Sequence, residues 1–156
     1  MLDITIVAVG KIKAGYYRDA FSEYQKRLRP YARLKVVELP AVPFLKNSQE
    51  QSKEFEREAL ENFLSKFEKG NNLVAVYLLA ERGQTFTSVE FAAWLNKKQP
   101  LILIIGGALG FSDLLYQKYP QISLSPLTFP HELARVVLIE QIYRATTIIN
   151  KKTYNY

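Results

Sequence analysis

The sequence predicts an α/β fold with a mostly parallel sheet flanked by helices. Short runs of β-branched and aliphatic residues alternate with longer amphipathic segments along the 156-residue chain. Two of the short runs, residues 73–79 and 101–105, are apolar on both faces, as expected of strands inside a parallel sheet. No repeat, low-complexity segment or linker divides the chain, so we expect residues 1–156 to form a single domain.

The first half of the chain contains two expected strands, each followed by a helix. The first strand is rich in β-branched residues and ends at Gly10. The first helix ends before Pro30, because proline lacks an amide donor and disfavours a helical residue before it. In order, we expect a strand at residues 3–9, a helix at 16–29, a strand at 34–39, a loop with two prolines at 40–48 and a helix at 49–68.

The second half continues this alternation. Thr87, with Glu90 three residues later, fits a capping box at the start of a helix that runs to about Lys98. The sequence Gly70-Asn71-Asn72 is expected to close the preceding helix, and Ser112 to cap a short one. The remaining expected elements are strands at 73–79, 101–105 and 122–125 and helices at 112–118 and 131–149.

Helical spacing identifies the face that each of the first two helices should bury. For the first helix these residues are Tyr17, Phe21, Tyr24 and Leu28. For the helix at 49–68 we expect a stripe of Phe55, Ala59, Phe63 and Phe67, with Leu60 and Leu64 beside it.

Composition excludes several classes of site. Cysteine is absent and His131 is the single histidine, which excludes disulfides, thiolate metal sites and a multi-histidine metal centre within one chain. We therefore expect no metal. The longest apolar run, residues 73–80, is too short to span a bilayer, which needs about 20 residues. The chain starts directly with a strand instead of a signal peptide, so we expect a cytoplasmic protein without membrane association.

The net charge of +6 is concentrated at the two ends of the chain. It is +5 in residues 1–35, −1 in residues 36–130 and +2 in residues 131–156. If the two ends lie together in the fold, they form a basic face suited to a nucleic acid. The alternative is that these lysines and arginines only solvate helix surfaces.

The final expected helix is apolar around most of its circumference. Its aliphatic residues do not fall on a single stripe, so it must be covered on more than one side. The protein's own sheet provides one cover. Either a second subunit, which would make a homodimer, or a neighbouring helix of the same chain provides the other.

Two loops in the last third of the chain are candidates for ligand binding. Gly106-Gly107-x-x-Gly110 follows a strand, and glycines there permit close backbone approach and positive φ. Residues 125–131 contain two prolines, which make a stiff loop whose main-chain groups suit binding of a flat ring. The alternatives are a plain strand-to-helix turn and an ordinary connection. The chain lacks the spacing of a dinucleotide-binding or P-loop motif.

Three side chains near these loops or in the tail are candidates for catalysis. His131 begins the last helix, where it acts either in catalysis or as a packing or capping residue. Arg135 lies one turn further on and has the chemistry to pair with phosphate or carboxylate. Tyr154 lies among tail lysines, where an aromatic ring can stack on an unpaired base. Arg144 and Glu140, four residues apart, are spaced to pair with one another.

Taken together, these motifs resemble a known family. The chain is similar to the small SPOUT-class methyltransferases that modify N3 of a pseudouridine in large-subunit (23S) ribosomal RNA, the RlmH family. The resemblance covers nearly the whole chain and is strongest in its last third. It is carried by Ile6-Val7-Ala8-Val9-Gly10-Lys11, Tyr24-x-x-Arg27-Leu28, residues 79–83, Ile105-Gly106-Gly107, Thr128-x-Pro130-His131 and Arg135-Val136-x-x-x-Glu140-Gln141-x-Tyr143-Arg144-Ala145.

The resemblance implies a SPOUT-type homodimer with a C-terminal trefoil knot that uses S-adenosyl-L-methionine to methylate 23S rRNA within the ribosome. It implies catalytic roles for His131, Arg135 and Tyr154, and places RNA phosphates on the basic N-terminal segment. The implied cofactor contacts are Leu79, Gly106, Leu124, Ser125, Pro126, Leu127, Thr128 and Phe129.

The chain departs from this family at its tail. Family members usually end in a Tyr-His pair, whereas Asn155 follows Tyr154 here. Asparagine forms hydrogen bonds but does not accept a proton near neutral pH. The sequence therefore supports an rRNA methyltransferase, with a catalytically impaired rRNA- or ribosome-binding protein of the same fold as the alternative. A nucleotide-binding α/β regulator without an RNA partner is a more distant alternative.

Overall fold

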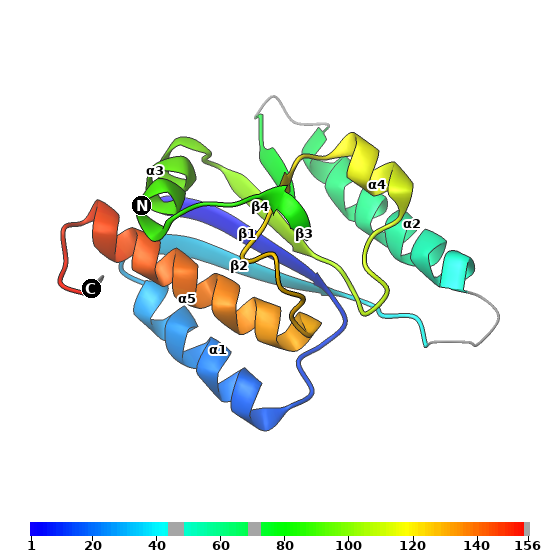
Figure 1. The fold of residues 1–156 in the computed structure, drawn as a ribbon, viewed down its shortest axis with the longest axis horizontal. Helices are drawn as coiled ribbons and strands as arrows, with labels where there is room; N and C mark the ends of the chain where they lie inside the picture. The colour runs from blue at the N-terminus through cyan, green and yellow to red at the C-terminus, as the bar shows by residue number, and fades with distance from the viewer. Residues whose placement is uncertain (44–48, 69–72, 155–156) are drawn as a thin grey trace.

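A computed structural model describes residues 1–43, 49–68 and 73–154, and confirms the predicted α/β fold. Figure 1 shows a twisted sheet with helices on both faces. The described strands form a parallel sheet in the order β2-β1-β4-β3-β5. The elements are β1 (Leu2–Val9), α1 (Gly15–Leu28), β2 (Ala32–Leu39), α2 (Gln49–Glu68), β3 (Ala75–Gln84), α3 (Ser88–Lys97), β4 (Leu101–Ile105), α4 (Asp113–Lys118), β5 (Gln121–Ile122) and α5 (His131–Ile149).

The core has one layer on each face of the sheet. Alternate residues of β1 point to opposite faces: Ile4 and Ile6 contact the layer of α1, α3 and α5, whereas Val7 contacts the layer of α2 and α4. Every residue of β4, the middle strand, is buried, as predicted for residues 101–105. Helices α1 and α5 lie side by side in Figure 1, so the two basic ends of the chain are neighbours in the fold.

Most predicted elements are confirmed, and the differences have physical causes. In α2 the buried residues are Ser52, Leu60 and Leu64, and the two leucines pack on β3 and β4. Phe63 and Phe67 of the predicted stripe are half-buried and pack against the same layer, whereas Phe55 at its start is 51% exposed. Ser112 stands at the N-cap of α4, but its hydroxyl makes no capping bond. The capping box of Thr87 and Glu90 is present. The expected helix end at residues 70–72 and part of the 40–48 loop lie outside the described residues.

Strand β3 differs most from its prediction, because it continues five residues past Leu79 as far as Gln84. It pairs with β5 at Leu78 and Leu79 and again at Gln84, with a shift in register between Leu79 and Gln84. Gly83 lies in this irregular stretch against β5. A Cβ atom there would lie 2.5 Å from the backbone carbonyl carbon of Ile122, so the close approach of the two strands requires glycine.

This packing predicts that Gly83→Ala destabilises the protein. The methyl group would meet β5 backbone that has no flexible side chain to move aside, and we expect a loss of about 1–3 kcal/mol in the free energy of unfolding. Urea denaturation followed by circular dichroism measures it. Gly15→Ala is the matched control, because its nearest neighbour is 3.7 Å away, at the end of Arg18. Equal stability of the two variants would contradict the conclusion that the close approach of β3 and β5 requires glycine at position 83.

Candidate functional site

A cavity of about 940 Å³ lies at the carboxyl ends of β3 and β4, beside the start of α5. Its walls come from residues 79–82, 105–111, 123–125 and 127–131, together with Tyr116 and Ala134. The two loops singled out in the sequence therefore face one another across a single space. Parallel sheets commonly bind ligands at this edge, where the strands end and the loops are free to diverge.

The glycine turn is shaped by packing as well as by backbone conformation. Gly110 has a φ of 73°, which favours glycine, and its amide donates to the Gly107 carbonyl at 3.1 Å. A Cβ atom at Gly106 would lie 3.2 Å from the ring of Phe111, and one at Gly107 would lie 3.1 Å from a carboxylate oxygen of Glu56. A side chain at either position would therefore crowd the protein's own side chains, which would have to shift by a few tenths of an ångström to admit it.

Two serines fold the loop at residues 123–130. The Ser123 hydroxyl donates to the Ser125 carbonyl at 2.8 Å, and the Leu127 amide donates to the Ser125 hydroxyl at 3.0 Å. Local side-chain bonds of this kind hold a loop in shape without a strand partner. The main chain of the loop is thereby fixed at the cavity wall.

Seven of the eight predicted cofactor contacts line the cavity. These are Leu79, Gly106, Leu124, Ser125, Leu127, Thr128 and Phe129. Pro126 does not line it and is exposed. Sequence reasoning missed Glu81, Arg82 and Tyr116, which do line it; Arg82 stacks on the Tyr116 ring at 4.5 Å. The run of apolar residues ends before Glu81, so only the continuation of β3 reveals Glu81 and Arg82, whereas Tyr116 is brought to the cavity by α4.

His131 lines the cavity at the first residue of α5. Burial lowers the pKa of its imidazole, and the positive charge of Arg135 lowers it further. The ring is therefore neutral at neutral pH and has a nitrogen free to accept a proton. The next residue, Glu132, accepts a hydrogen bond from the Ala14 amide at 3.1 Å and another from the Lys13 amide, which ties the loop after β1 to this helix end.

Arg135 is placed differently from the prediction, because its side chain does not line this cavity. It is only 1% exposed. Its guanidinium donates to the carbonyls of Gly10 at 2.6 Å and Val9 at 3.2 Å, and pairs with Glu38 at 3.0 Å. Arg135 therefore joins the ends of β1 and β2 to the first turns of α5.

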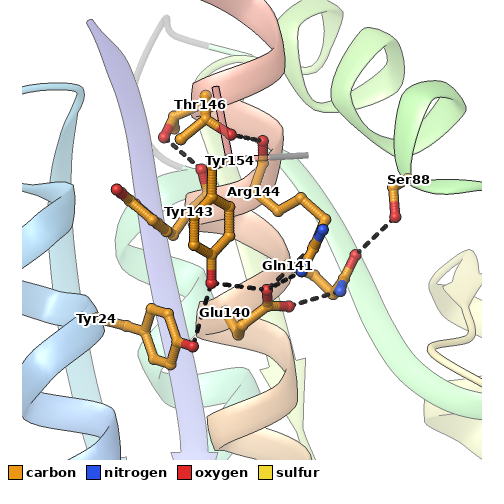
Figure 2. A network of polar contacts seen from close by, with 9 residues as sticks. Tyr24, Ser88, Glu140, Gln141, Tyr143, Arg144, Thr146 and Tyr154 are labelled. Carbon is orange, nitrogen blue, oxygen red and sulfur yellow. Dashed lines mark hydrogen bonds and ion pairs between the residues drawn. The ribbon is translucent and has the colours of Figure 1, made fainter. Parts of the chain in front are cut away.

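Tyr154 lies near the opposite end of α5 (Figure 2). Its hydroxyl is 3.3 Å from Tyr24 and from Glu140, and its ring packs edge-on against Tyr143 at 4.8 Å. The predicted pair of Glu140 and Arg144 is confirmed at 2.7 Å and belongs to the same network. Glu140 is six residues beyond the cavity-lining Ala134, about 9 Å along the helix axis. Asn155 lies outside the described residues.

The environment of Tyr154 decides its ionisation. Burial, the hydrogen bond with Tyr24 and the charge of Glu140 all raise the pKa of the phenol above its ordinary value. In this position Tyr154 stays protonated at neutral pH and donates or accepts hydrogen bonds without acting as a base.

No group of three or more histidine, cysteine, aspartate or glutamate side chains within 1–43, 49–68 and 73–154 is arranged to hold a metal ion. No helix in the same ranges is both long and apolar enough to cross a membrane.

Comparison with known proteins gives matches along almost the whole chain. Residues 2–155 match the family described as "Predicted SPOUT methyltransferase". Proteins named "Ribosomal RNA large subunit methyltransferase H" from Parabacteroides distasonis and Carboxydothermus hydrogenoformans are each 38% identical, over 99% of this chain and 99% of their own length. One of the same name from Kosmotoga olearia is 37% identical, over 99% of this chain and 100% of its own.

One solved structure, titled "Crystal structure of TrmJ from Z. mobilis ZM4", superposes on 93% of this chain and 70% of its own, with a TM-score of 0.49 and 13% identity. A likeness this distant says nothing about function.

The burial of Arg135 predicts a structural effect of its removal. In Arg135→Met the carbonyls of Val9 and Gly10 lose a charged donor, and we expect the free energy of unfolding to fall by about 2–4 kcal/mol. Urea denaturation again measures it. Arg27→Met is the control, because Arg27 pairs with Glu23 on the exposed face of α1 and its loss should leave the midpoint near that of the wild type. A midpoint for Arg135→Met that matches the control would contradict this role.

Proposed function

Because this chain belongs to the SPOUT methyltransferase family, we propose that it methylates large-subunit ribosomal RNA with S-adenosyl-L-methionine as the methyl donor. The observation that carries the proposal is the match of residues 2–155 to the family, together with relatives of that activity that align from end to end. The finer target that we propose is N3 of a pseudouridine in 23S rRNA, on ribosomes in the cytoplasm. Residues 1–156 would form a single SPOUT domain.

The residues around the large cavity fit such a cofactor. Its volume of about 940 Å³ lies within the range of sites that bind cofactors and other small molecules. Its walls combine apolar side chains with main-chain groups of the two loops. Leu124, Ser125, Leu127, Thr128 and Phe129, together with the glycine turn at Gly106, would hold the cofactor. When bound, S-adenosyl-L-methionine supplies a methyl group on a positively charged sulfur. The protein aligns the acceptor with that methyl group and keeps water away from it.

His131 is the proposed base. N3 of a pseudouridine carries a proton that must leave before the nitrogen forms a bond to carbon. A neutral imidazole at the cavity wall accepts such a proton, and the burial that lowers the pKa of His131 keeps it neutral. Arg135 acts as a positioning residue in this scheme, because it reaches the strand ends and not the cavity.

Tyr154 requires a second subunit to take part. Within one chain its hydroxyl is bonded to Glu140, well away from the cavity. We propose a homodimer in which α5 meets its partner, since this helix carries half-buried apolar residues such as Leu133 and Val137 outside its core stripe. In that arrangement Tyr154 of the partner subunit would complete the site. The C-terminal trefoil knot belongs to this proposal as well.

A second candidate function rests on the tail. Asn155 stands where relatives of this kind end in a histidine, and asparagine is not a base. A protein that retains the fold and the cofactor but has lost efficient catalysis would bind rRNA or the ribosome without modifying it.

Transfer of labelled methyl groups tests the two candidates. The wild-type protein and an Asn155→His variant are incubated with labelled S-adenosyl-L-methionine and ribosomes that lack this modification. We expect label in a pseudouridine of 23S rRNA with both proteins. Label with the variant alone would favour the binding protein, and label elsewhere or nowhere, despite cofactor binding, would contradict the proposed target.

The state of His131 predicts the pH dependence of turnover. Because its pKa is lowered, activity should persist below pH 6.5, about the ordinary pKa of histidine, and fall only at lower pH as the imidazole gains a proton. His131→Gln should lower kcat by about 10²–10³-fold and remove this acid limb. Fixed-time methylation assays over a range of pH measure both kcat and the acid limb of its pH profile. An unchanged profile in the variant would remove His131 from catalysis.

A further inference from the structure

A second cavity of about 320 Å³ lies on the α1 side of Arg135 and shares no lining residue with the large cavity. It is formed by the loop after β1, one face of α1 and the far end of β2. His131 and Arg135 are four residues apart on α5; His131 lines the large cavity, and Arg135 lines the second one.

The second cavity is rich in positive charge. Lys11, Arg18 and Arg135 line it, against the single carboxylate of Glu38, which already pairs with Arg135. The hydroxyl of Ser22 and the amide of Gln25 add neutral hydrogen-bonding groups. The lining therefore has a surplus of donors and a net positive charge, which suits an anion.

Arg135 supplies a donor that the protein itself leaves unmet. Its side chain is 1% exposed, yet its Nε–H has no hydrogen-bond partner among the described residues. The bonds to Gly10, Val9 and Glu38 fix the plane of the guanidinium. A buried donor without a partner is costly and rare, and a guanidinium held in place loses little entropy when it binds an oxyanion.

The surroundings point to the phosphate of a nucleic-acid strand. A third cavity adjoins the second at Gln25 and is lined also by Arg29, Ala32 and Leu34. Arg18 and Gln25 on α1 and Arg29 at its C-cap are spaced at intervals of seven and four residues, so they follow one face for about 16 Å. Such a row of positive and polar groups fits several successive phosphates, where a single small anion would occupy only one position.

We propose that the cavity lined by Lys11, Arg18 and Arg135 binds a backbone phosphate of the RNA strand whose target nucleotide enters the large cavity, and that Gln25 and Arg29 contact the strand beyond it. This inference rests on the proposed function for the identity of the strand. The phosphate would meet the unpartnered Nε–H of Arg135 while Lys11 and Arg18 close over it from the rim.

Nuclear magnetic resonance tests the site directly. The full-length ¹⁵N-labelled protein is titrated with inorganic phosphate and, separately, with a single-stranded oligouridylate of about twelve nucleotides, while the arginine Nε–H signals are followed. We expect the Arg135 signal to shift saturably with both ligands, and the oligouridylate to bind about tenfold more weakly in Lys11→Gln/Arg18→Gln. The control Lys26→Gln/Arg33→Gln makes the same change in charge on the same segment, outside the cavity, and should weaken binding less than about twofold.

Methylation kinetics then separate the possible sources of the phosphate. With ribosomes as substrate, Lys11→Gln/Arg18→Gln should raise KM about tenfold and reduce the slope of log KM against log salt by about one, with kcat and cofactor affinity unchanged. An Arg135 signal that moves with neither ligand would overturn the site. A signal that moves with phosphate, together with an unchanged KM for ribosomes, would indicate a site for a free phosphate and overturn the RNA assignment. If the wild-type protein binds no cofactor, the proposed function fails, yet the titration still decides whether this cavity holds phosphate.

Discussion

The buried guanidinium of Arg135 holds together the part of the molecule where the candidate sites lie. Parallel strands end at one edge of a sheet, and the loops that leave them have no ladder partners to fix their direction. Here β1 ends at Val9 and is followed by Gly10, whose φ of 83° turns the chain. The planar guanidinium of Arg135 donates hydrogen bonds to the carbonyls of Val9 and Gly10 and to the carboxylate of Glu38. The position of the first turns of α5, and with it that of His131, follows from this arrangement.

This interaction also explains why a charged group is retained inside the fold. Burial alone lowers the pKa of Arg135, and the charge of Glu38 opposes that effect. Its two terminal nitrogens donate to the carboxylate of Glu38 and to the carbonyls of Val9 and Gly10. Its Nε–H has no hydrogen-bond partner among the described residues. An aliphatic residue would fill the same space but would leave two strand-end carbonyls without a donor.

Sequence patterns predicted the order of elements because hydrophobic periodicity reports local burial. Residues 131–149 were predicted as a helix with the bounds that α5 has, and the capping box at Thr87 is present. Periodicity does not report where a strand continues after its apolar run, so the extension of β3 and the cavity residue Arg82 were missed. The family motif brought attention to Arg135 but not to its placement, because the distance between α5 and the ends of β1 and β2 depends on packing among residues nearly a hundred or more positions apart. Tyr154 shows the same limit: its partner Tyr24 comes from α1.

Helix α5 connects all of these features at fixed angular positions. It has 19 residues, with Ala134 at the large cavity, Arg135 at the strand ends and Glu140 at the tail network. One inserted residue would rotate everything beyond it by about 100° and advance it by about 1.5 Å. An insertion between Arg135 and Glu140 would therefore turn the tail network away from α1 while leaving the cavity in place. The number of residues between these positions is therefore fixed, and changes in chain length must fall in the loops.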